Sequence, residues 1–110
     1  MDPVVTLYRY KNSDISVTIE AGFEDERLII DGYDIGSKVA AYWGDSDYEY
    51  TTTLQPASVA ALYVLLGLES GDKQSLLESI AARFNTDRCY SQIQEWLEKN
   101  NIAFEGFSWI

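Results

Sequence analysis

The chain has 110 residues, a length that fits one domain and leaves no room for a second. Its 18 acidic side chains outnumber the 8 basic ones, and the formal net charge of −10 argues against nucleic acids and anionic membranes as partners. It contains no histidine and one cysteine, Cys89, which excludes a Ser-His-Asp triad, a Cys-His pair and an intramolecular disulfide.

The first part of the chain carries the patterns of β-strands. Residues 4–10 are rich in β-branched and aromatic side chains, and residues 15–21 alternate between apolar and polar. The polar residues 11–14 between them indicate a turn, so the two strands are expected to form an antiparallel hairpin. Residues 22–26 predict a second turn and residues 27–30 a third strand.

A turn and a short helix are expected to follow the third strand. The pair Asp31-Gly32 is a strong turn signal. Ser37 can cap a short helix that Gly44 ends, because glycine adopts the left-handed conformation readily. Residues 48–54 then alternate again and predict a fourth strand.

Helical spacing replaces strand alternation in the second half of the chain. Pro56 suits the first turn of a helix that ends at Gly67. A second helix starts at Asp72 or at Ser75, where the spacing from Ser75 to Glu78 matches a capping box.

The second helix is expected to end at Asn85, and Thr86 or Asp87 to cap a third one. Cys89 falls on the apolar side of that third helix and is read as a small buried side chain. The aromatic tail 102–110 predicts a docked last strand. The order of elements predicts an α+β domain spanning residues 1–110: a mostly antiparallel sheet of four N-terminal strands and one C-terminal strand, with about three helices on one face.

The negative charge is concentrated in one third of the chain. Residues 12–49 carry ten acids and two bases, a net charge of −8, against +1 for residues 1–11 and −3 for residues 50–110. Acidic residues interleaved with tyrosines favour a surface that binds a basic protein. The candidate contact residues are Asp31, Tyr33, Asp34, Tyr42, Asp45, Asp47 and Glu49.

Two plainer readings stay open. The acidity can serve solubility alone. Tyr48 and Tyr50 alternate with Glu49, so if the acid faces water these two rings face the helices and belong to the core.

No motif of catalysis or cofactor binding is present. The sequence holds no phosphate-binding glycine loop and no dinucleotide fingerprint. A calcium loop counted from Asp45 fails, because its sixth and twelfth positions hold Tyr50 and Pro56 instead of glycine and glutamate. We therefore expect a protein that is not an enzyme and that needs no cofactor and no metal.

Two segments, residues 28–36 (LIIDGYDIG) and residues 42–50 (YWGDSDYEY), resemble a group of small acidic bacterial proteins. Some of that group are similar to immunity proteins of contact-dependent growth inhibition, and the chain resembles the partner of a toxin of the pancreatic-ribonuclease type. This resemblance implies an inhibitor that binds its cognate toxin tightly and occludes the active site. It assigns a role and no individual residues.

The sequence thus predicts an immunity protein that binds a basic nuclease domain as a monomer, one to one. No signal-peptide pattern opens the chain and no apolar run has the length of a membrane span, so a cytoplasmic location is expected, with no contact to membranes or nucleic acid. The alternative is an acidic interaction or regulatory module that binds an unrelated partner or itself.

Overall fold

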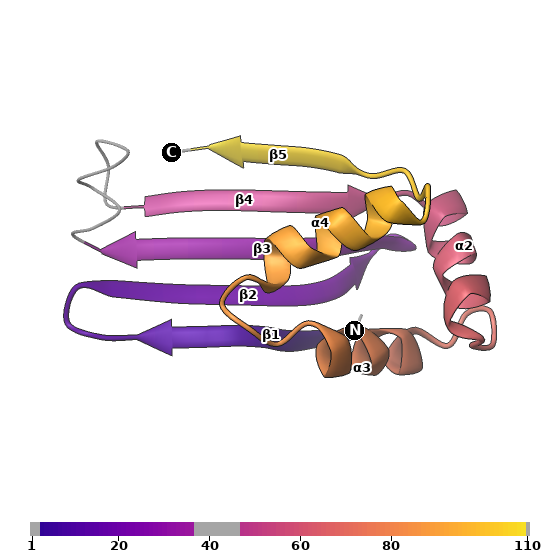
Figure 1. Ribbon diagram of the computed structural model, residues 1–110, viewed down its shortest axis with the longest axis horizontal. Coiled ribbons are helices and arrows are strands. Elements are labelled where there is room, and N and C mark those ends of the chain that lie inside the picture. The colour runs from indigo at the N-terminus through magenta and orange to yellow at the C-terminus, as the bar shows by residue number, and fades with distance from the viewer. Residues whose placement is uncertain (1–2, 37–46, 110) are drawn as a thin grey trace.

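The computed structural model describes residues 3–36 and 47–109, which form one five-stranded antiparallel sheet and three helices. The strands follow one another across the sheet in chain order. This confirms the expected α+β class, with four N-terminal strands and one C-terminal strand (Figure 1). The strands are β1 (Val4–Lys11), β2 (Ile15–Glu24), β3 (Arg27–Gly36), β4 (Asp47–Leu54) and β5 (Glu105–Trp109).

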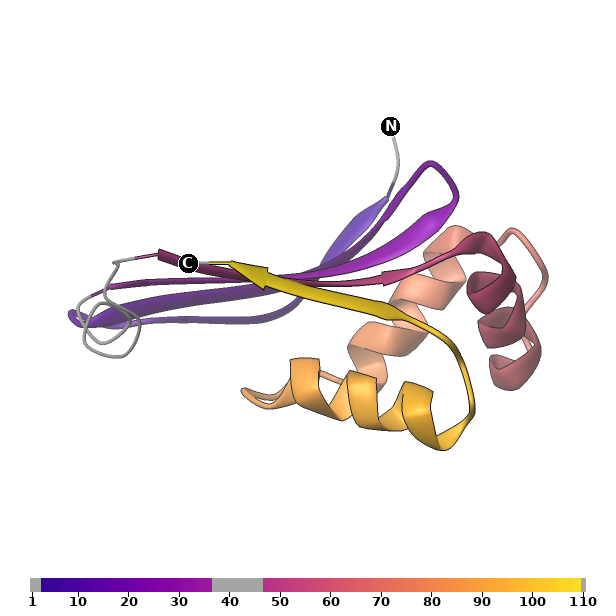
Figure 2. The same cartoon turned by 90° about the horizontal axis from the view of Figure 1, so that it is seen from above.

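The helices are α2 (Pro56–Leu66), α3 (Lys73–Arg83) and α4 (Cys89–Lys99). Figure 2 shows that α3 and α4 lie against one face of the sheet, while α2 lies at the end where β4 finishes. The described helices leave the opposite face uncovered, and the strands also run past α4 at the far end of the helix-side face (Figure 1). The molecule is elongated, with extents of 43 × 27 × 21 Å.

The core fills the space between the helix-side face and the helices. Alternate residues of the strands point into it, because successive side chains of a strand project to opposite faces. Cys89 is fully buried, as its helical spacing predicts. The largest fully buried side chains are Ile19, Leu28, Ile30, Leu54, Leu62, Leu76, Leu77, Ile80, Leu97, Thr52 and Cys89.

The two N-terminal hairpins turn differently from each other. The predicted turn 11–14 is confirmed: Asn12 Oδ1 accepts hydrogen bonds from the backbone N–H groups of Asp14 at 2.7 Å and Ile15 at 2.8 Å. The predicted turn 22–26 is wrong, because β2 continues to Glu24. Only Asp25 and Glu26 turn the chain, both with positive φ (50° and 66°), as a two-residue hairpin turn with matching twist requires.

The turn predicted at Asp31-Gly32 is also wrong, because β3 runs through both residues to Gly36. Gly32 pairs in register with Tyr50 of β4, and a Cβ added to Gly32 would lie 1.8 Å from Cε2 of the Tyr50 ring. The glycine therefore makes room for an aromatic ring lying across the strand, a recognised reason for glycine inside a sheet.

The helix ends decide one open alternative and correct two expectations. Asp72 caps α3 by accepting the Ser75 backbone N–H at 3.2 Å and the Ser75 hydroxyl at 2.7 Å, so Asp72 begins this helix and Ser75 does not. Helix α3 ends at Arg83, before the expected Asn85. Helix α4 begins after Arg88, which makes no side-chain cap. The short helix expected from Ser37 to Gly44 lies outside the described residues.

Candidate functional site

The face of the sheet that the described helices leave uncovered, hereafter the open face, carries most of the predicted contact residues that the structure describes. The strand register aligns Thr18, Tyr33 and Glu49 in one row across β2, β3 and β4. Glu20, Asp31 and Thr51 form the neighbouring row. Both rows alternate with the row of Ile19, Gly32 and Tyr50, which faces the helices, so the side chains of both rows point away from the core.

Three carboxylates of the open face, those of Glu20, Asp31 and Glu49, lie on neighbouring strands. Glu20 and Asp31 are direct cross-strand partners, an arrangement of like charges that destabilises a sheet. Thr51 relieves part of this by donating its hydroxyl to Asp31 Oδ1 at 3.1 Å. Among residues 3–36 and 47–109, no ion pair involves Glu20, Asp31 or Glu49.

The open face is shallowly hollowed around Asp31. One hollow of about 270 Å³ is lined by Asp31, Gly32, Tyr33 and Glu49. Asp31 also lines a second hollow of about 170 Å³, on whose wall Glu20 stands. The structure thus brings Asp31, Tyr33 and Glu49 together in one place, with Tyr33 half-buried between the two acids. Glu20, which the sequence reading did not select, joins them through the register of β2.

Asp34 lies apart from these residues. It projects to the helix-side face, where the Tyr50 hydroxyl donates a hydrogen bond to Asp34 Oδ1 at 2.8 Å. Burial raises the pKa of Asp34 above its ordinary value of 3.8, and the bond from Tyr50 acts in the opposite direction. Burial and the nearby Asp34 also raise the pKa of Tyr50. The pair is placed to orient the Tyr50 ring, which makes Asp34 a structural group of that face.

The remaining predicted residues are placed only in part. Asp47 pairs in register with Ile35, beside the row of Tyr33 and Glu49, and its side chain lies outside the description. Tyr42 and Asp45 lie outside the described residues.

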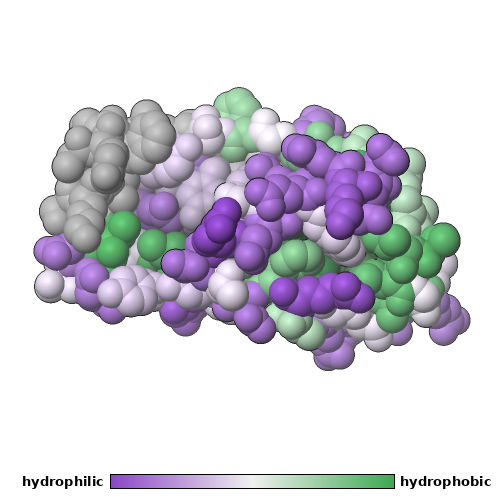
Figure 3. Space-filling model, viewed as in Figure 1, coloured by the Kyte–Doolittle hydropathy of each residue, from purple (hydrophilic) through white to green (hydrophobic). Residues whose placement is uncertain are grey.

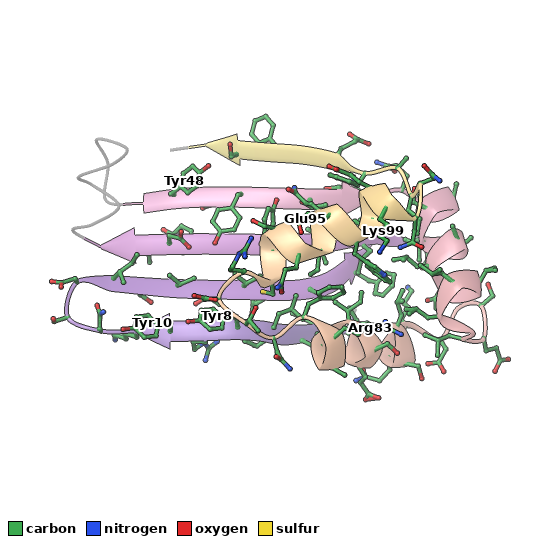
Figure 4. The ribbon with its side chains drawn as sticks, in the orientation of Figure 1. Tyr8, Tyr10, Tyr48, Arg83, Glu95 and Lys99 are labelled. Carbon is green, nitrogen blue, oxygen red and sulfur yellow. The ribbon has the colours of Figure 1, made fainter. Side chains whose placement is uncertain are left out.

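A groove on the helix-side face is the second feature that could bind a partner. It measures about 510 Å³ and opens where the sheet extends past α4. Tyr48 and Tyr50 contribute to it, which confirms that they face the helix side. Figure 4 shows Tyr8, Tyr10 and Tyr48 on the part of the sheet that the described helices do not cover. Its lining residues are Ile19, Asp34, Tyr48, Tyr50, Asp87, Arg88, Tyr90, Ser91, Gln94, Gly106, Phe107 and Ser108.

The wall between this groove and the core is a hydrogen-bonded aromatic cluster. The Tyr50 and Tyr90 rings meet edge to face with centroids 4.6 Å apart, and Tyr48 lies 5.5 Å from Tyr50. Gln94 donates to the buried Thr52 hydroxyl at 2.9 Å, and Thr52 donates to the Tyr90 hydroxyl at 2.7 Å. The alternation of Tyr48 and Tyr50 with Glu49 predicted two members of this cluster, whereas the sequence patterns did not single out Tyr90.

Cys89 carries the one thiol of the chain. Burial raises the pKa of the Cys89 thiol, which disfavours the thiolate that a nucleophile needs. Within the part of the chain that the structure describes, no group of three acidic or cysteine side chains is gathered to hold a metal ion. No helix in that part is long and apolar enough to cross a membrane.

Comparison of the chain with protein-family models, with curated proteins and with solved structures found no match.

Proposed function

We propose that this protein is an immunity-type inhibitor that binds a basic toxin domain, of ribonuclease type, through its open face. The observation that carries the proposal is the hollow that Asp31 and Glu49 line together with Tyr33, with Glu20 opposite Asp31 on the next strand. Among the described residues no cation is paired to these three carboxylates. The proposed role is binding rather than catalysis, and it is exercised in the cytoplasm of the cell that is protected.

Electrostatics supports a basic partner. A lysine or arginine placed about 4 Å from one carboxylate at a protein surface gains on the order of 4 kcal/mol before its desolvation is subtracted. The net charge of −10 adds a long-range field. Such a field can raise association rates to roughly 10⁸–10⁹ M⁻¹s⁻¹ at low salt. Fast capture is what an inhibitor needs when a few toxin molecules are harmful.

The sheet holds the carboxylates rigidly. Glu20, Asp31 and Glu49 lie on β2, β3 and β4, each paired on both sides, so little backbone entropy is lost when a partner binds. Tyr33 supplies an aromatic ring among the acids, where a cationic side chain can stack for about 0.5–1 kcal/mol. Charge gives attraction and speed, and the ring together with the shape of the hollow gives selectivity.

The mode of inhibition follows from the chemistry of nucleases. A ribonuclease binds the phosphates of its substrate with basic side chains. Carboxylates presented on a firm surface can occupy those side chains in place of the phosphates. An inhibitor of this kind excludes RNA from the active site without any reaction of its own.

The proposal is tested by capture followed by titration. The immobilised protein is exposed to a lysate of the cells that make it, washed at moderate salt, and the retained proteins are identified. The proposal predicts a basic nuclease domain whose RNA cleavage stops at one equivalent of added protein. Retention of no basic protein, or of a partner whose activity is unchanged at excess inhibitor, would refute it and leave an acidic interaction module as the better reading.

A further inference from the structure

Helix α2 differs from the other two described helices in having no charged residue. Its sequence is PASVAALYVLL, and only its Ser58 and Tyr63 carry polar side-chain groups. Val59, Leu62 and Tyr63 are buried against the rest of the domain. A surface helix ordinarily shows polar residues opposite its buried side. α2 does not.

The outward side of α2 is a continuous apolar strip. Ala57, Ala60, Ala61 and Val64 are all exposed, and their i, i+3, i+4, i+7 spacing places them along one line of the helix. Leu65 lies beside them, 43% exposed, and Val64 is 82% exposed. These five residues are called the α2 strip below. Figure 3 shows apolar surface gathered at the end of the molecule where α2 lies.

The other helices show what a solvent-facing side looks like in this protein. Helix α4 exposes Ser91, Glu95, Glu98 and Lys99, and has a well separated apolar side. The exposed side of α4 is therefore polar, unlike the exposed side of α2. Contiguous exposed apolar surface of this kind marks an interaction site.

We propose that the α2 strip is the contact between two copies of this chain, packed as an antiparallel pair of α2 helices. This proposal does not rest on the immunity function. A twofold contact must be complementary to itself. The strip meets this condition in antiparallel orientation, because its small residues Ala57 and Ala60 lie toward one end and its larger residues Val64 and Leu65 toward the other.

The charge distribution favours a second copy over a basic partner at this place. The strip is uncharged, so it offers nothing that would select a cation. It also lies at the end of a 43 Å molecule, beyond the last residue of β4 (Figure 1). Each chain has a net charge of −10, and Asp31 and Glu49 lie in the middle and far parts of their strands. When two chains meet at α2, the acidic residues of one copy therefore stay away from those of the other.

The response to salt separates this contact from the proposed toxin complex. Two chains of like charge repel each other, so added salt should screen the repulsion and tighten the dimer. Binding of a basic protein should weaken under the same change. Failure of one proposal therefore leaves the other untouched.

The test uses single cysteines and mild oxidation, since the native Cys89 is fully buried and is the only cysteine of the chain. Antiparallel pairing centred near Ala61 predicts that Ala61→Cys forms a disulfide-linked dimer. Ala57→Cys alone should remain monomeric, whereas a mixture of Ala57→Cys and Val64→Cys should cross-link. Ala82→Cys, on the exposed part of α3, is the matched control and should give no dimer.

Sedimentation equilibrium gives the second readout. Val64→Lys should raise the dimer dissociation constant by roughly tenfold or more, because the change enters a twofold contact twice. Ala82→Lys should leave it unchanged, and circular dichroism checks that both variants fold. A wild-type protein that stays monomeric up to millimolar concentration, or an Ala61→Cys that does not cross-link, overturns the proposal. Self-linking of Ala57→Cys overturns the antiparallel arrangement.

Discussion

Replacement of Gly32 by alanine tests how the two faces of the sheet are coupled. The added Cβ would lie 1.8 Å from Cε2, 2.1 Å from Cζ and 2.5 Å from Cδ2 of Tyr50. Contacts this short are impossible, so either the Tyr50 ring or strand β3 must move. The ring is fixed by its hydrogen bond to Asp34 at 2.8 Å and by its edge contact with Tyr90 at 4.6 Å.

The size of the effect follows from what the ring loses. The aromatic pair is worth about 0.5–1.5 kcal/mol. The hydrogen bond to the carboxylate is worth about 1.5–3 kcal/mol. Because such terms do not add fully, we expect Gly32→Ala to lower the free energy of unfolding by about 2–4 kcal/mol. For a domain of this size the loss corresponds to a fall of roughly 10–20 °C in Tm.

The assay is urea unfolding in a double-mutant cycle with Tyr50→Ala. Once the ring is gone, the alanine at position 32 should cost less than about 0.5 kcal/mol, or should stabilise the strand, since glycine is the poorer strand residue. Gly106→Ala is the matched control on the same face, because its added Cβ would meet Gln94 Nε2 at an ordinary 3.7 Å. Equal costs of Gly32→Ala with and without the Tyr50 ring would refute the reasoning.

Three further predictions concern stability. Asp72→Ala should cost about 1 kcal/mol in urea unfolding because it removes the α3 cap, whereas Glu78→Ala should cost less than about 0.5 kcal/mol. Burial raises the pKa of Asp34 in the folded protein above the value of 3.8 in the unfolded chain. The stability that this difference contributes is present below pH 3.8 and is lost as the pH rises through the folded-state pKa. The stability of Asp34→Asn relative to the wild type should therefore rise between about pH 3.5 and about pH 7. Leu62→Ala should cost about 2–5 kcal/mol at a concentration where the chain is monomeric, and Val64→Ala, at an 82% exposed position, almost nothing.

Each of these has a clear opposite result. Equal losses of stability for the substitutions at Asp72 and Glu78 would support the predicted capping box from Ser75 to Glu78 instead of the Asp72 cap. A difference between wild type and Asp34→Asn that is the same at both pH values would mean that the carboxyl has an ordinary pKa in the folded protein. A cost at Val64 as large as that at Leu62 would mean that the strip is buried within a single chain.

The alternation of the strands was readable from the sequence because it depends on neighbours in the chain. The faces of Tyr48, Tyr50 and Glu49 followed from the period of two, and the burial of Cys89 from the helical period. The turn at 11–14 was readable too, since the Asn12 side chain satisfies the backbone groups next to it. Local chemistry of this kind is visible in one stretch of sequence.

The errors arose where a distant residue decides the local structure. Gly32 signals a turn by itself, and it stays in the strand because the Tyr50 ring from β4 needs its space. Asp34 was grouped with Asp31 because both are acidic and near in sequence. The three-residue separation puts them on opposite faces, and the length of β3 that fixes this is set by its pairing with β2 and β4. Glu20 was overlooked because its place beside Asp31 exists only in the folded register.

The affinity of the captured basic partner for two matched double variants tests the central claim most directly. Asp31→Asn with Glu49→Gln removes two charges from the open face, and Glu69→Gln with Glu98→Gln removes two from exposed positions elsewhere. Measured at two salt concentrations, the first variant should bind roughly tenfold more weakly and with a shallower salt dependence, while the second should stay within about twofold of the wild type. Equal weakening by both variants, or by neither, would contradict docking at the open face.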